Sequence, residues 1–155
     1  MFYIRFARLL MVLIVTSCGY DGGKKSGSSS GTPTGASPDS PSFSISMANT
    51  DVNLGSVSIG SQTSIYTLTV NNTGTISGYC YGPYKTGSES WEYTIVQDNC
   101  TYRTIPGASS CTVKVRGIPN GKGLRFMQLE LSCYDSSYSY SSNISLFTNF
   151  TMTGI

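Results

Sequence analysis

From Phe43 onward, apolar and polar residues alternate over short runs, and residues that favour turns separate the runs. A period of two, with β-branched and aromatic residues at the apolar positions, is typical of strands that bury one face. The runs are FSISM (43–47), SIYTLTV (64–70), WEYTIV (91–96), CTVKV (111–115), MQLELSC (127–133) and ISLFTNFTM (144–152). No window after the first eighteen residues has a helical stripe. The pattern therefore predicts an all-β domain over residues 43–155.

The turn signals support a sandwich of two sheets. NNTG (71–74), IPG (105–107) and PNGKG (119–123) combine Asn, Pro and Gly, which favour tight turns. We expect Gly74 to adopt a positive φ after a strand, and Pro106-Gly107 to form a tight turn. About seven to eight short strands joined in this way predict a β-sandwich.

The chain begins with the pattern of an export signal. Arg5 and Arg8 precede an apolar run from Leu9 to Val15, and this run is too short to span a bilayer. Residues 1–17 are therefore predicted to be a signal peptide. Residues 18–42 are almost all small, polar or proline, so we expect a flexible, disordered linker with a root-mean-square span of roughly 27 Å.

The end of the signal resembles the lipobox of bacterial lipoproteins. VTSC (15–18) has a branched apolar residue, two small residues and then a cysteine. The resemblance implies that Cys18 becomes the first mature residue and carries two or three acyl chains, which suffice for stable membrane anchoring. Gly19 after the cysteine, in place of Asp, implies sorting to the outer membrane, facing either the periplasm or the cell surface. The alternative is an ordinary secretory signal with a chance cysteine.

Composition limits the chemistry. Without Arg5 and Arg8, eight basic residues balance eight acidic ones, so nothing indicates nucleic-acid binding. The chain has no histidine, which removes the usual general base and the commonest metal ligand. The acidic residues show no spacing that indicates a glycosidase pair. We therefore expect no enzymatic activity, no cofactor and no metal.

Four cysteines remain once Cys18 is assigned to the lipid: Cys80, Cys100, Cys111 and Cys133. An even number in an exported domain indicates disulfides, and three pairings are possible. A Cys₄ zinc site is an alternative, but the usual CxxC spacing is absent. A cysteine nucleophile would lack a histidine base.

Two segments resemble the bacterial choice-of-anchor D repeat, which belongs with the abnormal-spindle/hydin (ASH) domains. These domains are immunoglobulin-like and similar in fold to the major sperm protein. The matching positions are Leu54, Gly55, Val57, Gly60, Asn72-Thr73-Gly74, Cys100, Pro106-Gly107, Cys111, Val113, Val115, Pro119 and Gly123. Leu54 replaces the usual Phe, Gly117 replaces a bulky residue before the proline, residues 75–97 match poorly, and residues 134–155 run past the usual end of the repeat. The resemblance implies an immunoglobulin-like sandwich and a Cys100–Cys111 disulfide, which leaves Cys80 and Cys133 as the second pair.

Tyrosines gather in two segments, GYCYGPYKTGSESWEY (78–93) and CYDSSYSYSSN (133–143). Tyrosine among Ser, Gly and Asn is the composition of adaptable recognition loops. The candidate binding rim consists of Tyr81, Tyr84, Tyr134, Tyr138 and Tyr140. The alternative is that Trp91 and Tyr93 pack in or on the sandwich and that the other tyrosines are ordinary surface residues. The expected function is a membrane-anchored, non-catalytic binding or structural module of the cell envelope, with an envelope protein or a glycan as partner. A carbohydrate-binding surface adhesin is the alternative.

Overall fold

The computed structural model describes residues 41–136 and 142–155. Cys18, the predicted linker up to residue 40, Tyr138 and Tyr140 lie outside the described residues. No described helix is long and apolar enough to cross a membrane. The described strands are β1 (Ile45–Met47), β2 (Asp51–Val57), β3 (Tyr66–Asn72), β4 (Gly78–Thr86), β5 (Tyr93–Asp98), β6 (Thr104–Ile105), β7 (Ser109–Gly117), β8 (Gly123–Asp135) and β9 (Ile144–Gly154), with one 3₁₀ turn, η1 (Ser90–Glu92).

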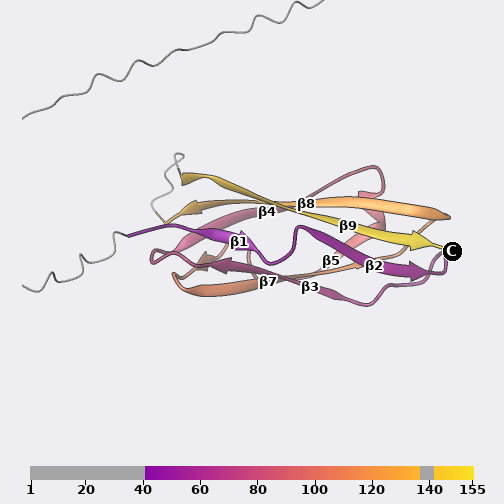
Figure 1. Ribbon diagram of the computed structural model, residues 1–155, viewed down its shortest axis with the longest axis horizontal. Coiled ribbons are helices and arrows are strands. Elements are labelled where there is room, and N and C mark those ends of the chain that lie inside the picture. Colours follow the sequence, from indigo (N-terminus) through magenta and orange to yellow (C-terminus); the bar gives the residue numbers. More distant parts are fainter. Residues whose placement is uncertain (1–40, 137–141) are drawn as a thin grey trace, which may run out of the picture. The chain divides into compact units, whose positions relative to one another are not determined.

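The strands form a two-sheet sandwich, as the sequence predicts (Figure 1). The smaller sheet has the order β1-β3-β7-β5 and the larger sheet the order β2-β9-β8-β4-β6. The chain changes sheets at its start, because β1 pairs antiparallel with β3 whereas β2 pairs parallel with β9. The parallel pairing begins only at Asn149, so β2 lies beside the second half of β9.

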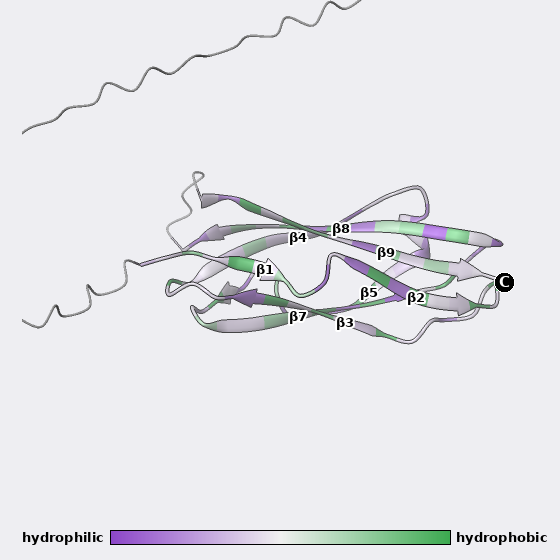
Figure 2. Ribbon diagram, viewed as in Figure 1, coloured by the Kyte–Doolittle hydropathy of each residue, from purple (hydrophilic) through white to green (hydrophobic). Residues whose placement is uncertain are grey.

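The core lies between the sheets and follows the alternation of the sequence (Figure 2). In β8, every second residue from Met127 to Cys133 is fully buried. The completely buried side chains of β3, β5, β7 and β9 are Leu68, Val70, Tyr93, Val113, Val115, Thr148, Phe150 and Met152. Burial of alternating apolar side chains from both sheets is what holds such a sandwich together.

One strand prediction needs correction at its start. Trp91 and Glu92 belong to the 3₁₀ turn, in which the Glu92 N–H donates to the Glu89 carbonyl, and the strand begins at Tyr93. An ion pair holds Glu92 in this turn: its buried carboxylate accepts hydrogen bonds from Nε and Nη2 of Arg125, at 2.9 and 2.6 Å. Tyr93 is completely buried, whereas the Trp91 side chain is 63% exposed.

The hydrophobic pattern did not predict strand β4, because its buried face carries small residues and its other face carries the large ones. Its buried positions are Gly78, Cys80 and Gly82, and its large side chains point to the outer face. A Cβ atom on Gly78 would collide with the ring of Phe43. Small residues are therefore required on the inner face of β4, and they carry little hydrophobic signal.

The expected backbone geometry of Gly74 is wrong. Gly74 is not among the residues with positive φ; a Cβ there would instead collide with the carbonyl oxygen of Ser42. In the second half of the chain, the left-handed residues include Tyr102 (φ 56°) and Ala108 (φ 53°). The absence of a side chain at Gly74 thus allows the backbone around Ser42 to approach closely.

Candidate functional site: a tyrosine face backed by two disulfides

The structure contains both expected disulfides: the Cys100–Cys111 pair that the family resemblance implies and the Cys80–Cys133 pair that remains. Cys80 of β4 and Cys133 of β8 are direct cross-strand partners, with Cα atoms 4.1 Å apart. Cys100 and Cys111 are joined with Cα atoms 5.2 Å apart. Stable disulfides form in oxidising compartments, so the two bonds indicate an extracytoplasmic location.

Three tyrosines lie on the opposite side of the sheet from the Cys80–Cys133 bond. Successive side chains of a strand point to opposite faces, so Tyr79 and Tyr81 flank Cys80 on the outer face, and Tyr134 follows Cys133 there. Tyr79 is the cross-strand partner of Tyr134. The ring of Tyr81 contacts those of Tyr79 and Tyr134 edge to face, with centroids 5.1 and 5.8 Å apart.

Tyr102 adds a fourth ring from a separate loop. Its N–H donates to the carbonyl of Cys80 at 2.9 Å, and the preceding Thr101 forms a β-bridge with Cys80. The Tyr102 ring stands perpendicular to that of Tyr81, with centroids 5.9 Å apart. Its side chain is 63% exposed. We call Tyr79, Tyr81, Tyr102 and Tyr134 together the tyrosine face.

Hydrogen bonds to Asp98 and a disulfide fix the loop that carries Tyr102. One carboxylate oxygen of Asp98 accepts hydrogen bonds from the N–H groups of Cys100 (2.9 Å) and Thr101 (3.1 Å), and the other accepts one from the Thr101 hydroxyl. The disulfide to Cys111 ties the same turn to β7. These contacts maintain Tyr102 at a positive φ, which costs about 1 kcal/mol for a residue with a Cβ.

The tyrosine face brings together only part of the predicted rim. Tyr81 and Tyr134 belong to it. Tyr84 lies farther along β4, beyond a register shift, opposite Glu130, and is 50% exposed. Tyr102 was missed, because no local pattern marks it; its place beside Tyr81 depends on the pairing of Cys80 with Thr101.

A second polar cluster lies at the start of β5 and serves the fold. The Tyr93 hydroxyl donates to the carbonyls of Arg125 (2.9 Å) and Phe150 (3.3 Å). Burial, and then the charge of Glu92, raises the pKa of Tyr93 well above its usual range, so Tyr93 stays protonated. A neutral, fully bonded tyrosine next to an ion pair has no reactive group to offer.

The described residues contain no group of three or more Cys, Asp or Glu side chains placed to hold a metal ion. The four described cysteines are all in disulfides, so none of them has a free thiolate with which to bind a metal or attack a substrate. The tyrosine face offers aromatic rings, hydroxyls and backbone groups that can contact a ligand.

Comparisons with known proteins identify the fold. No family model matches the chain, and no curated protein matches it. Among solved structures, the ASH/PapD-like domain 7 of human CEP192 superposes with a TM-score of 0.56 at 14% identity, covering 82% of this chain and 96% of that domain. The VesB protease of Vibrio cholerae superposes with a TM-score of 0.54 at 17% identity, covering 72% of this chain and 31% of that protein. The periplasmic chaperone SfaE superposes with a TM-score of 0.54 at 13% identity, covering 72% of this chain and 58% of the chaperone. The described domain thus has an immunoglobulin-like sandwich fold, similar to that of the ASH/PapD-like domain.

Proposed function

We propose that this protein is a lipid-anchored, non-catalytic binding module of the bacterial cell envelope, and that the tyrosine face is its recognition surface. The observation that carries the proposal is the position of Tyr102. A strained backbone, an Asp98 cap and a disulfide together hold a largely exposed ring against Tyr81. Strain of this kind persists where the surrounding structure over-determines it, and such residues cluster at functional sites.

The anchor is the second part of the proposal. The two disulfides support an extracytoplasmic location, and the lipobox-like VTSC supports acylation of Cys18. A lipid anchor followed by a polar linker would present the sandwich at the surface of a membrane. In that setting the partner would be an envelope protein.

A glycan is the second candidate ligand, favoured by the chemistry of the exposed rings. Tyr102 and Tyr84 are 63% and 50% exposed, and each offers an apolar face next to a hydroxyl. Aromatic rings with adjacent polar groups suit sugar rings, which have apolar faces and hydroxyl edges. Under this alternative the protein is a surface adhesin.

The experiment uses the anchored full chain as bait in quantitative pull-downs from envelope extracts, and the same chain on a glycan array. We compare Tyr102→Ala with Trp91→Ala, because the two side chains have the same exposed fraction and only Tyr102 belongs to the tyrosine face. Loss of one specific protein with Tyr102→Ala alone supports the proposal. Loss of a glycan signal with that variant alone selects the adhesin. Ligand binding that resists Tyr102→Ala and Tyr81→Ala would exclude the tyrosine face as the recognition surface.

A further inference from the structure

In the part of the chain that the structure describes, the first half of β9 has a strand on one side only. Residues 144–148 pair with β8 in continuous antiparallel register, but β2 begins to pair with β9 only at Asn149. β1, the neighbouring segment, pairs with β3 in the other sheet. Among the described residues, this half of β9 is therefore an open edge of the larger sheet.

The backbone groups that face this open edge follow from the alternation of a strand. The Asn149 N–H donates to the Thr50 carbonyl on the β2 side, at 2.7 Å. Ser145 and Phe147, two and four residues earlier in unbroken register, direct their N–H and C=O groups to the same side. Within residues 41–136 and 142–155, these groups have no hydrogen-bond partner. They are a template for one more strand.

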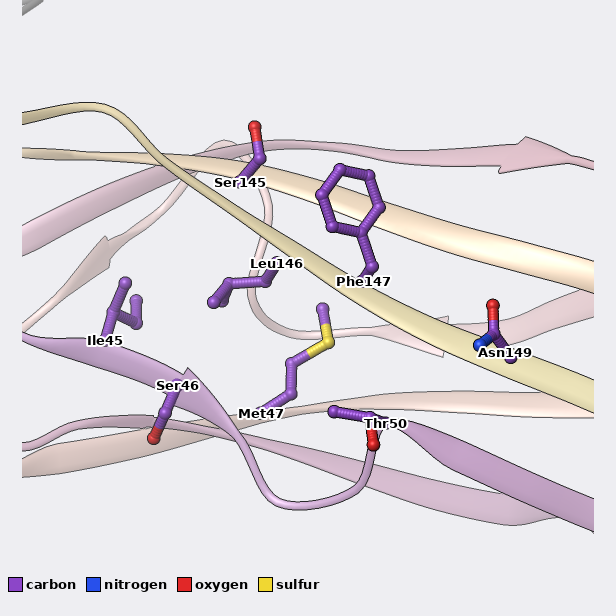
Figure 3. A pocket seen from close by; sticks show the side chains of 8 residues that line it. All are labelled: Ile45, Ser46, Met47, Thr50, Ser145, Leu146, Phe147 and Asn149. Atoms are coloured by element: carbon purple, nitrogen blue, oxygen red, sulfur yellow. The ribbon is translucent and has the colours of Figure 1, made fainter. Parts of the chain in front are cut away.

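Beside the open edge lies a groove of about 410 Å³ between β1 and β9. Figure 3 shows Leu146 of β9 pointing toward Ile45 and Met47 of β1, whereas Phe147 points to the outer face. The remaining lining residues are Ser46, Thr50, Ser145 and Asn149. Proteins usually protect an open edge with Lys, Pro or a bulge, and residues 144–149 contain none of these.

We propose that the open edge of β9 pairs with the same edge of a second copy of this chain. The backbone pattern is self-complementary: with a twofold axis at Leu146, Ser145 lies opposite Phe147 of the other copy. Both pairs then exchange N–H···O bonds, and the two Leu146 side chains meet beside the grooves. This proposal is independent of what the tyrosine face binds.

Charge favours a second copy over a charged partner. No residue that lines the groove is charged. Residues 41–155 contain six basic side chains (Lys85, Arg103, Lys114, Arg116, Lys122, Arg125) and six acidic ones (Asp51, Glu89, Glu92, Asp98, Glu130, Asp135). Two copies of a domain with zero net charge approach each other without long-range repulsion.

The test places the photo-crosslinking residue p-benzoylphenylalanine at position 147 of the full chain in intact cells. We expect a crosslinked product of twice the chain mass, with the crosslink mapped by mass spectrometry to residues 144–148 of the second copy. The matched control carries the probe at Leu124, which is 69% exposed at the other end of the larger sheet. Equal dimer yields from the two positions would indicate random collision and overturn the proposal.

A perturbing variant completes the test. Ser145→Pro removes an N–H that faces the open edge and leaves the pairing with β8 intact, so the crosslinked dimer should fall at least tenfold while the circular dichroism spectrum is unchanged. If that variant fails to fold, Leu146→Asp, which places two like charges at the axis, gives the same readout. Crosslinking of position 147 to a different protein, or to none, would overturn the proposal.

Discussion

Cys80 and Cys133 face each other directly across β4 and β8, with Cα atoms 4.1 Å apart, and the tyrosines next to them in sequence point to the other side of the sheet. The disulfide therefore lies directly beneath Tyr79, Tyr81 and Tyr134. The carbonyl of the same Cys80 accepts the hydrogen bond from the Tyr102 N–H. One residue thus links the core of the larger sheet to all four rings of the tyrosine face.

The two disulfides should contribute unequally to stability. They close loops with sequence separations of 53 and 11 residues. In the chain-entropy model, replacing both cysteines by alanine lowers the free energy of unfolding by about 4 kcal/mol for Cys80–Cys133 and about 3 kcal/mol for Cys100–Cys111. Urea denaturation of the two double variants measures the difference. A larger loss from the shorter loop would contradict the entropic account.

The left-handed backbone of Tyr102 makes a prediction with an internal control. Glycine adopts a positive φ without the steric cost that alanine incurs, so Tyr102→Gly should be more stable than Tyr102→Ala by about 1 kcal/mol. At Tyr84, in the strand β4, the order should reverse, because glycine destabilises strands. Thermal unfolding of the four variants checks both orders. The same order at both positions would contradict the assigned geometry of Tyr102.

Asn72 should be the most important polar residue of the NTG segment. It is 1% exposed, and its amide nitrogen lies 2.9–3.1 Å from the carbonyl oxygens of Ile76, Ile105 and Pro106. Asn72→Ala leaves these carbonyls without their donor, so the free energy of unfolding should fall by about 3 kcal/mol. Asn71→Ala, one residue earlier and half-exposed, should cost about 0.5 kcal/mol or less. Chemical denaturation measures the free energy of unfolding of both variants, and equal losses would refute the role given to Asn72.

The hydrogen bonds to Glu89 should make the stability of the domain depend on pH. Hydrogen bonds from the Ser88 hydroxyl (2.6 Å) and the Phe126 N–H (3.1 Å) lower the pKa of Glu89 below its ordinary value of 4.5. A lowered pKa in the folded state means that the ionised carboxylate stabilises the fold at pH values above 4.5, and that this contribution is lost as the pH falls through the folded-state pKa. The stability difference between wild type and Glu89→Gln should therefore shrink between pH 6 and pH 3. A difference that is constant over this range would contradict the assignment. Ser88→Ala, which removes one donor, should show a smaller pH-dependent difference.

The lipid anchor has a direct test. Cys18→Ala should move the protein from the membrane fraction to the soluble fraction, because Cys18 is the only residue proposed to carry acyl chains. Cell fractionation followed by mass spectrometry of the mature amino terminus makes the measurement. Membrane retention of the variant, or an unmodified amino terminus in the wild type, would refute acylation.

The fold class could be predicted from the residue pattern alone. The alternation in SIYTLTV, CTVKV and MQLELSC reflects the physical requirement that one face of each strand meets the core, and the structure has β3, β7 and β8 there. The cysteine content of the domain, together with the family resemblance, likewise led to the two disulfides of the structure. These signals are local or depend on a motif, so they can be recognised without knowing which strands are neighbours.

Which residues become neighbours across the two sheets could not be predicted without the folded structure. On β4, the buried positions are Gly78, Cys80 and Gly82, because close packing leaves no room there for larger side chains. The folded structure placed Tyr102 beside Tyr81, and among the described residues it left the first half of β9 paired on the β8 side only, because β1 and β2 divide between the two sheets. Contacts between residues distant in sequence depend on the pairing of all the strands at once, and no single run of residues contains that information.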